Sequence, residues 1–467
     1  MKPIFFIGGI YMEKTVAVVL AAGEGKRMKS NYSKVVHKVC GKPIIERVTE
    51  SVKKANIEKC ILVVGHKKEQ VMELLGESVG YAIQEEQLGT GHAVMQAVPL
   101  LGDAKNVVIL CGDAPLITEE TIKEVISINE KEGRAATIIT ANFDNPTGYG
   151  RVIRDAKGAV KAIVEEKDAT ADEKKVTEIN SSMYCFDKEA LCSALGKLTN
   201  NNAQHEYYLT DVIKIMIDEN KKVDTYIVKD KSEIMGINNR VQLYEASEIL
   251  KKKINTMHML NGVTIISPDN TYIEEGVQIG KDTIIYPGTI LEKNTIIGEN
   301  CVIGQNNRIT NTIVGNNTEI ISSVLIDSKV GNNTHIGPFA WLRPNSNVGD
   351  NIRIGDFVEI KNSNIGNGTK VSHLTYVGDS DIGENVNFGC GTVTVNYDGI
   401  NKHRTVVGNN VFIGCNTNLV APVKLGDRVY TAAGTTVTDD VPDDALVIGR
   451  CRQEIKNGWT KGKIKGC

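Results

Sequence analysis

The sequence predicts two structural parts, an α/β doubly wound (Rossmann-like) domain followed by a parallel β-helix. From about Val277 to Val437 an apolar residue returns at every sixth position. This period fits neither a helix nor an ordinary strand and is typical of the hexapeptide repeats of a parallel β-helix. Over residues 15–238, short apolar runs alternate with helical patterns, as they do in a doubly wound sheet. A chain of 467 residues also favours more than one core.

Composition narrows the functional classes. A net charge of -3 argues against a nucleic-acid partner, and no apolar run approaches the roughly twenty residues of a membrane span. The ten cysteines form no CxxC pair, and we interpret them as reduced thiols in a cytoplasmic protein. We expect residues 1–14 to be an N-terminal extension and not a signal peptide, because a strand and a glycine loop follow without a spacer.

The first strand and loop predict a phosphate site. Thr15–Leu20 is an apolar run, and the loop of residues 21–28 is rich in small residues. Small residues let backbone N–H groups approach a phosphate, and Arg27 and Lys34 would neutralise its charge. A tight strand-to-helix turn without a ligand is the alternative.

Polar residues follow two later strands of the predicted sheet. Gln84 and the loop of residues 87–92 come after the apolar run of residues 81–83, and Asp113 comes after that of residues 107–110. Ligands of such sheets bind at the carboxyl ends of the strands. Asp113 is well placed to hold Mg²⁺ against a nucleotide phosphate, although an N-cap of the next helix is the alternative.

The second half begins after a predicted linker. An apolar stripe over residues 239–259 predicts a helix, so we expect a linker over 239–261 and the β-helix with a C-terminal arm over 262–467. Arg343 and Lys361 flank inward positions, so they should project outward and could hold a sugar phosphate. The segment from Asn396 to Gly399 interrupts the period and should project from a coil as a loop.

Six motifs in order carry a family resemblance. They resemble those of sugar-phosphate nucleotidyltransferases and comprise residues 20–28, 34–37, 87–93, 112–113, 146–151 and 236–240. With the hexapeptide part, the chain from Thr15 to about Trp459 resembles the bacterial bifunctional N-acetylglucosamine-1-phosphate uridylyltransferase / glucosamine-1-phosphate N-acetyltransferase family. The resemblance implies a left-handed β-helix and a homotrimer. It also implies two reactions. Acetyl-CoA acetylates glucosamine-1-phosphate, and UMP is then transferred from UTP to N-acetylglucosamine-1-phosphate in a Mg²⁺-dependent step that releases pyrophosphate. The product, UDP-N-acetylglucosamine, would be a precursor of peptidoglycan, lipopolysaccharide or other envelope polymers.

For uridylyl transfer, the resemblance implies a set of residues in the first domain. Arg27 and Lys34 are implied as catalytic cations, and Asp113 and Asn238 as metal ligands. The implied substrate-binding residues are Lys34 and Asn238 again, with Leu20, Ala21, Ala22, Gly23, Gln84, Gly89, Thr90, Cys111, Gly112, Gly150, Glu165 and Asn180. The sequence departs from the family at Ser33, Cys111 and Ser181-Ser182, where the family usually has Pro, an aromatic residue and Thr-Gly.

For acetyl transfer, the resemblance makes His373 the general base, oriented by Glu359, because an amine must lose a proton to attack a thioester. A polar surface histidine is the alternative. The implied substrate-binding residues are Arg343, Lys361, Tyr376 and Asn387, and those for acetyl-CoA are Cys390, Asn396, Tyr397, Cys415, Ala433 and Arg450. Residues on a convex prism need a second surface to enclose a ligand, so we expect this site between subunits.

Two other functions remain open at this point. The β-helix could serve only to form the trimer, which would leave a single nucleotidyltransferase activity. The chain could also be a regulatory protein that binds a nucleotide sugar without reacting with it. His373 with Asn387, Asn396 and Tyr397 argues against the first alternative, and Asp113 with Asn238 against the second.

Overall fold

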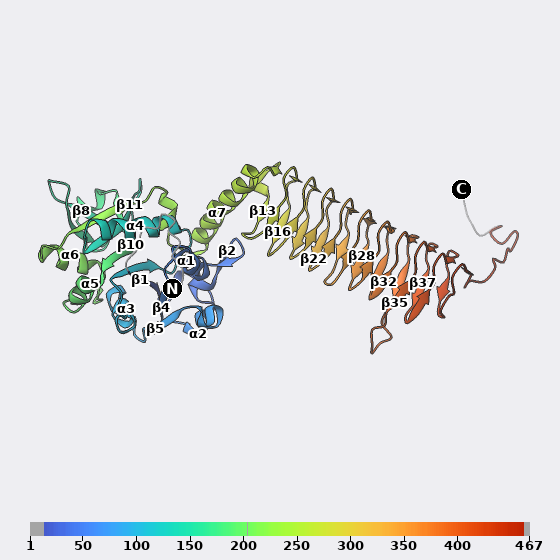
Figure 1. Cartoon of the computed structure of the whole chain (residues 1–467), viewed down its shortest axis with the longest axis horizontal. Helices are drawn as coiled ribbons and strands as arrows, with labels where there is room; N and C mark the ends of the chain where they lie inside the picture. The colour runs from blue at the N-terminus through green and yellow to red at the C-terminus, as the bar shows by residue number, and fades with distance from the viewer. Residues whose placement is uncertain (1–13, 203, 462–467) are drawn as a thin grey trace, which may run out of the picture. The chain divides into compact units, whose positions relative to one another are not determined.

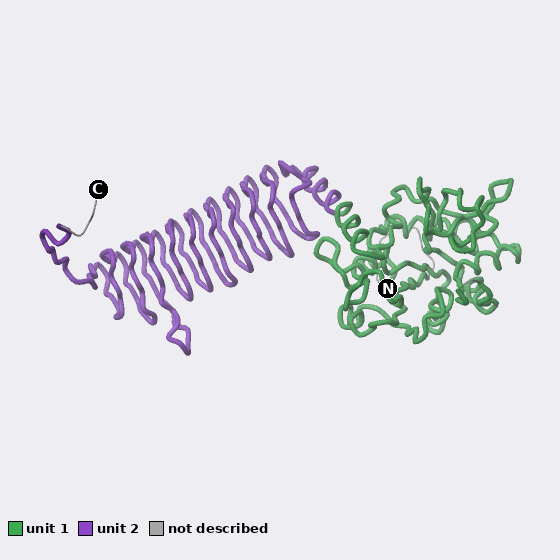
Figure 2. The backbone as a smooth tube through the Cα atoms, turned by 180° about the vertical axis from the view of Figure 1, so that it is seen from behind, with its two compact units in different colours: residues 1–250 green, residues 251–467 purple. Residues whose placement is uncertain are grey.

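The computed structural model describes residues 14–202 and 204–461. The chain divides into two compact units, residues 1–250 and 251–467, and the boundary lies inside helix α7 (Arg240–Leu260) (Figure 2). Helix α7 covers nearly the span expected of the linker. The expected N-terminal extension lies outside the described residues apart from Lys14, as do the last residues of the expected C-terminal arm.

A mixed sheet of nine strands forms the centre of the first unit (Figure 1). Its main path has the order β11-β7-β10-β6-β1-β4-β5, and β8 and β9 extend from β10. Strands β1, β4, β5 and β6 are parallel, as predicted, whereas β10 runs antiparallel to both of its neighbours β6 and β7. The bounds are β1 Thr15–Ala21, β4 Lys59–Val64, β5 Gly80–Ile83, β6 Asn106–Cys111, β7 Ala136–Asn142, β8 Gly150–Arg154, β9 Val160–Val164, β10 Glu178–Asp187 and β11 Val223–Ile227.

Alternate residues of β1 explain why both faces of this sheet are covered. Val16 and Val18 belong to one buried cluster, and Ala17 and Val19 belong to the other, because successive side chains of a strand point to opposite faces. Helices α3 (Thr90–Ala97), α5 (Lys188–Leu195) and α6 (Thr210–Asp218) supply the first cluster. Helices α1 (Ile44–Lys54), α2 (Lys68–Leu75) and α4 (Glu119–Lys131) supply the second. The doubly wound prediction is confirmed.

The second unit is a left-handed parallel β-helix. Its short strands run from β12 (Thr264–Ile265) to β41 (Leu446–Val447) and join three parallel sheets in turn, so that three hexapeptides make one coil (Figure 1). The residues of the predicted series point inward, for example Ile285 and Leu291, which are fully buried. Thr283 and Thr289 are also buried, and their hydroxyls donate to the carbonyl oxygens of Gly298 and Gly304 at 2.8 and 2.9 Å.

Glycine follows the inward residue where successive coils approach closely. A Cβ atom at Gly298 would lie 2.7 Å from the carbonyl carbon of Gly315 on the next coil. Any larger residue would therefore push the two coils apart, which explains the repeated Ile-Gly pairs.

The segment between β34 (Val393–Val395) and β35 (Thr405–Val407) leaves the coil as a loop (Figures 1 and 2). Tyr397 pairs with Lys402 across its base, and Asp398 lies 2.7 Å from Nε2 of His403. Hydrogen bonds from the backbone N–H of Asn401, from His403 and from Ile400 lower the pKa of Asp398 to about 2. The prediction of a projecting loop is confirmed.

Two further features concern the cysteines and the hydropathy of the helices. The nine cysteines among the described residues are all free thiols. Across residues 14–202 and 204–461, none of the helices has the length and hydropathy needed to span a bilayer.

Candidate active sites

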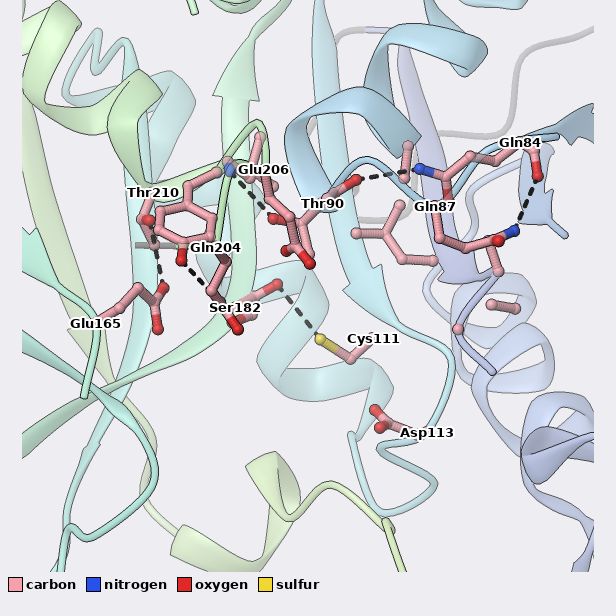
Figure 3. Close-up of a pocket in the computed structure, with 18 of the residues that line it drawn as sticks. Gln84, Gln87, Thr90, Cys111, Asp113, Glu165, Ser182, Gln204, Glu206 and Thr210 are labelled. Atoms are coloured by element: carbon pink, nitrogen blue, oxygen red, sulfur yellow. Dashed lines mark hydrogen bonds between the residues drawn. The ribbon is translucent and has the colours of Figure 1, made fainter. Parts of the chain in front are cut away.

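A cavity of about 460 Å³ opens at the carboxyl ends of β1 and β6. Figure 3 shows polar side chains from several segments around it, including Gln84, Thr90, Asp113 and Glu165. Eleven residues expected at the nucleotide site line it: Leu20, Ala21, Ala22, Gly23, Lys34, Gln84, Gly89, Thr90, Cys111, Asp113 and Glu165. The structure thus gathers most of the expected residues of the first domain around one cavity.

Two residues that line this cavity, Lys34 and Asp113, contact each other, and Lys34 also contacts Asn238, which is not among the lining residues. The Nζ atom of Lys34 lies 2.5 Å from Oδ2 of Asp113 and 3.1 Å from Oδ1 of Asn238. A carboxylate oxygen and an amide oxygen therefore converge on the ammonium group of Lys34. Oxygen ligands of this kind suit Mg²⁺, which usually takes one or two carboxylates and completes its shell with water and substrate phosphates. The residues present fit such a metal.

Gln84 is held firmly at the side of the cavity. It is 3% exposed, and its amide nitrogen donates to the carbonyl oxygen of Gly89 at 3.1 Å and contacts Nδ1 of His92 at the same distance. The amide oxygen of Gln84 is thereby left to accept a hydrogen bond. A uracil ring offers an N–H donor that such an acceptor can bind.

The loop before α3 is joined to a segment far along the chain. Gly91 N–H donates to the carbonyl of Tyr207 at 2.7 Å, and the N–H of Leu209 donates to Oγ1 of Thr90 at 3.1 Å. Gly89 has φ of 106°, and a Cβ there would lie 2.7 Å from the Tyr207 oxygen. Only glycine fits this position, which explains the Gly-Thr-Gly sequence.

Glu165 lies at the far side of the cavity, near the other residues expected to bind the sugar. Its carboxylate accepts a 3.3 Å hydrogen bond from Thr210, and burial raises its pKa. Gly150 is close enough that an added Cβ would lie 3.4 Å from Glu165 and 3.5 Å from Asn180. Asn180 is buried and donates to the hydroxyl of Tyr184 at 2.9 Å.

Arg27, Gly112 and Cys111 are related to the cavity in three different ways. Arg27 is exposed on a short 3-10 helix (Lys26–Met28) and is not among the residues that line the cavity. The Gly112 N–H donates to the carbonyl of Leu20 at 2.9 Å, so it shapes the cavity through the backbone. The Cys111 thiol contacts the carbonyl oxygens of Ser181 and Ser182, and burial raises its pKa, which keeps the thiol protonated.

Sequence reasoning missed one wall of this cavity. Gln204, Glu206, Tyr208 and Thr210 all line it and come from a single segment before and at the start of α6. The signal available was a dense run of polar and aromatic residues between two helices, which can carry function when a rigid scaffold holds it.

Cations gather on the outer surface of the β-helix. Arg343 donates to Glu359 at 2.7 Å, and its guanidinium lies 4.8 Å from the ring centre of Trp341. Lys361 lies 3.7 Å from Asp379, and the adjacent ammonium of Lys402 lowers its pKa. Lys402 belongs to the projecting loop and was not predicted. Cations that repel one another in this way form a ready site for an anion such as a phosphate.

The projecting loop brings its first residue to the same place. Asn396 is buried, donates to Asp379 and lies 3.5 Å from the hydroxyl of Tyr376. Tyr397 is exposed, and its hydroxyl donates to the carbonyl of Gly399 at 2.6 Å. The expected residues Tyr376 and Asn396 are thus adjacent, although their positions in the sequence are well separated.

His373 has a different partner from the one expected. Its Nδ1 lies 2.7 Å from Oδ1 of Asp356, whereas Glu359 accepts from Arg343. Strand register is the reason, because Asp356 pairs with His373 in one sheet and Glu359 pairs with Tyr376 in the next. The expectation that Glu359 orients His373 is therefore replaced by a contact from Asp356.

Three of the residues expected at acetyl-CoA form a column on successive coils. Asn387 pairs with Phe412 where β33 (Asn387–Phe388) meets β36 (Phe412–Ile413), and Phe412 pairs with Tyr430 of β39 (Tyr430–Thr431). The same register continued by three residues aligns Cys390, Cys415 and Ala433, all of which are exposed. At Gly434 an added Cβ would lie 3.6 Å from Cδ of Arg450, so Arg450 lies beside the end of this column.

Comparisons with known proteins find matches to both halves of the chain. A family model described as nucleotidyl transferase matches residues 16–252, and one described as bacterial transferase hexapeptide (six repeats) matches residues 270–305 and 404–439. The bifunctional protein GlmU of Acetivibrio thermocellus is 54% identical over 97% of this chain and 99% of its own length. That of Thermoanaerobacter pseudethanolicus is 55% identical over 97% and 99%, and that of Clostridioides difficile is 52% identical over 96% and 97%.

Both family models match, and the relatives share more than half of their residues with this chain over nearly its full length. These findings identify the family. The chain belongs to the GlmU family of bifunctional enzymes, which join a glucosamine-1-phosphate acetyltransferase to an N-acetylglucosamine-1-phosphate uridylyltransferase in the synthesis of UDP-N-acetylglucosamine.

Proposed function

We propose that the cavity of the first unit performs uridylyl transfer with Lys34, Asp113 and Asn238 as its centre. The main support is that the side-chain oxygens of Asp113 and Asn238 converge on the ammonium of Lys34, at 2.5 and 3.1 Å. These two residues would hold Mg²⁺, which neutralises charge on the transferring phosphate when it is bound. Lys34 is then free to contact a phosphate oxygen of UTP.

The chain's own residues supply positioning in this reaction. Gln84 binds the uracil, and Glu165 with Gly150 and Asn180 binds the hydroxyls of N-acetylglucosamine-1-phosphate. A phosphate oxygen of the sugar phosphate attacks the α-phosphorus of UTP, and the bond to pyrophosphate breaks. Such transfers need charge neutralisation and in-line alignment more than covalent help.

The outer surface of the β-helix performs acetyl transfer in the same proposal. The Arg343, Lys361 and Lys402 cations hold the phosphate of glucosamine-1-phosphate. Nε2 of His373 takes a proton from the substrate amine, whose nitrogen attacks the thioester carbonyl of acetyl-CoA. The carbon–sulfur bond then breaks, and the imidazolium returns the proton to the thiolate, so that coenzyme A leaves as its thiol. Cys390, Cys415, Ala433 and Arg450 contact acetyl-CoA, with Arg450 near its phosphates.

An exposed apolar column supports a homotrimer. Phe339, Phe357 and Leu374 occupy the same turn position on three successive coils and are 59%, 60% and 59% exposed. The two phenyl rings stack with centres 5.5 Å apart. All three residues have positive φ, a costly conformation for bulky side chains. The column lies beside Asp356 and His373 in the sequence, so a partner seated on it would cover the acetyl site.

The proposed location is the cytoplasm. UTP and acetyl-CoA are cytoplasmic metabolites, and the nine free thiols among the described cysteines suit a reducing compartment. Two observations favour this proposal over the alternatives. A β-helix that served only for trimerisation would need no cluster of cations on its outer surface, and a protein that only bound a nucleotide sugar would need no carboxylate and amide oxygens that converge on Lys34.

One experiment with purified full-length protein tests both activities. EDTA should abolish formation of the UDP sugar and leave acetyl transfer unchanged. The variant His373→Ala should lower acetyl transfer roughly 10²- to 10⁴-fold, the usual contribution of a positioned acid-base group, and leave uridylyl transfer unchanged. Equal loss of both activities in either arm would contradict the proposal.

A further inference from the structure

Asp356 and His373 lie opposite each other on neighbouring coils. Asp356 ends β27 (Arg353–Asp356), and His373 ends β30 (Lys370–His373), which pairs with it in parallel register. The Oδ1–Nδ1 distance is 2.7 Å. The N–H of Leu374 also donates to the carbonyl oxygen of Asp356 at 2.9 Å. The backbone therefore fixes the two residues against each other, and the contact does not depend on flexible side chains alone.

This contact settles which ring nitrogen of His373 is available. An ionised carboxylate can only accept hydrogen bonds, so Nδ1 must carry the proton, and Nε2 is left with a lone pair. The hydrogen bond from His373 is also the main cause of the lowered pKa of Asp356. When Nε2 takes up a proton, the carboxylate stabilises the positive imidazolium that forms.

The strands around β30 offer no other acid for this role. Strand β30 lies between β27 and β33 in its sheet. Their charged residues are Arg353 and Asp356 on β27 and Lys370 on β30, and Arg353 pairs with Lys370 at the far end of the two strands. Glu359 belongs to a different sheet and is 2.7 Å from Arg343. The carboxylate on the strands paired with His373 is thus Asp356.

We propose that Asp356 is the positioning residue of the acetyl-transfer site, which holds the tautomer of His373 that can accept a proton at Nε2. This inference rests on the proposed function of His373 as general base. It also gives Glu359 a separate task, that of holding Arg343 in place for the sugar phosphate.

The chain contains a matched control pair on the same sheet. Nδ1 of His335 lies 2.9 Å from Oε2 of Glu319, and these residues pair across β21 (Glu319–Ile320) and β24 (His335–Ile336). The chemistry and the register resemble those of Asp356 and His373. None of the residues assigned to either substrate belongs to this pair, so its loss should not affect acetyl transfer.

The test compares Asp356→Asn, Asp356→Glu, Glu359→Gln and Glu319→Gln in the full-length protein. We expect Asp356→Asn to lower kcat for acetyl transfer by at least about tenfold, part of the roughly 10²- to 10⁴-fold contribution of a positioned base. Both KM values should stay within about twofold. The acid limb of the pH–rate profile should move to lower pH, because the imidazolium loses its carboxylate neighbour. Asp356→Glu should recover part of kcat, and Glu319→Gln should match the wild type.

Other outcomes separate the inference from the function on which it rests. A kcat within twofold of the wild type for Asp356→Asn, or an acid limb moved by Glu359→Gln in its place, would overturn the role of Asp356. Full acetyl transfer in His373→Ala would instead remove the proposed base itself. Circular dichroism and sedimentation of the same samples report whether the β-helix of each variant is folded and assembled, because uridylyl transfer depends on the first unit. If Asp356→Asn loses its fold, Asp356→Glu is compared with Glu319→Gln in its place. Asp356→Glu keeps the carboxylate but displaces it, so a kcat equal to that of the control would overturn the role of Asp356.

Discussion

Glu165 and Glu166 are neighbours in the sequence, but their carboxyl groups have opposite environments. Burial at the cavity raises the pKa of Glu165 above its ordinary value of 4.5. Glu166 accepts from the N–H of Gly148 at 3.2 Å and from Arg151 at 2.8 Å, and these contacts lower its pKa. Both residues follow the end of β9, but Glu165 contacts Thr210 and lines the cavity, whereas Glu166 holds Gly148 and Arg151. Glu165 is therefore placed to contact a ligand, and Glu166 stabilises the fold.

The pair predicts stability changes of opposite sign. A raised pKa means that the unfolded chain releases the Glu165 proton first, so stability falls as the pH rises from 4.5 through the folded-state pKa. Glu165→Gln should therefore raise the melting temperature at pH 7, with a gain that shrinks towards pH 4. Glu166→Gln should lower it at pH 7, because a lowered pKa stabilises the folded state above 4.5. Scanning fluorimetry across this range is the measurement, and a loss of stability in Glu165→Gln at pH 7 would contradict the assignment.

The proposed metal site predicts that Lys34 competes with the metal for Asp113. Replacing Lys34 by Met removes a charge-assisted hydrogen bond, which typically contributes about 1.5–3 kcal/mol. The affinity for Mn²⁺ without nucleotide should therefore rise by roughly tenfold or more, as measured by electron paramagnetic resonance, while uridylyl transfer falls. Lys26→Met, in the exposed pair with Glu24, is the control and should bind Mn²⁺ as the wild type does. Mn²⁺ binding that survives Asp113→Asn would refute the metal site.

The apolar column predicts the state of association. Phe357→Asp places a charge on the stacked pair of Phe339 and Phe357 and should convert the proposed trimer into monomers in analytical ultracentrifugation. Acetyl transfer should then fall with the trimer, whereas uridylyl transfer should persist because its cavity belongs to one unit. Ile313→Asp, at a 45% exposed position on another sheet, is the control. Equal dissociation of both variants would show that the column has no special part in assembly.

A shared acetyl site predicts complementation. The variants His373→Ala and Arg450→Ala should each have low acetyl-transfer activity when assayed alone. If they are unfolded together and refolded as mixed trimers, some interfaces receive wild-type His373 from one chain and wild-type Arg450 from another, and part of the activity should return. Activity that stays at the mean of the two variants, with mixing proven by mass spectrometry, would assign both residues to one chain.

Much of the fold could be predicted because the spacing of buried residues along the sequence follows the period of each type of secondary structure. The hexapeptide period identified the inward residues of the β-helix, and it included Thr431, which is 1% exposed. Its hydroxyl oxygen accepts a hydrogen bond from the N–H of Gly414 and lies 3.1 Å from the hydroxyl of Thr417. The parallel strands before the nucleotide cavity were equally clear as apolar runs. Strand β10 was missed because its ten residues mix polar and apolar side chains and it joins the sheet antiparallel.

The sequence by itself determined the two domains and the family, and it identified the segments that contain the candidate catalytic and binding residues. The tertiary structure alone decided which of these residues meet. Asp356 and Glu359 are both acids three residues apart, and only strand register gives His373 to the first and Arg343 to the second. Lys402, Gln204 and Tyr208 likewise reach their sites through loops whose path depends on contacts with distant segments. Short-range patterns record burial and turn geometry, whereas the pairing of side chains depends on the register between segments that are far apart in the chain.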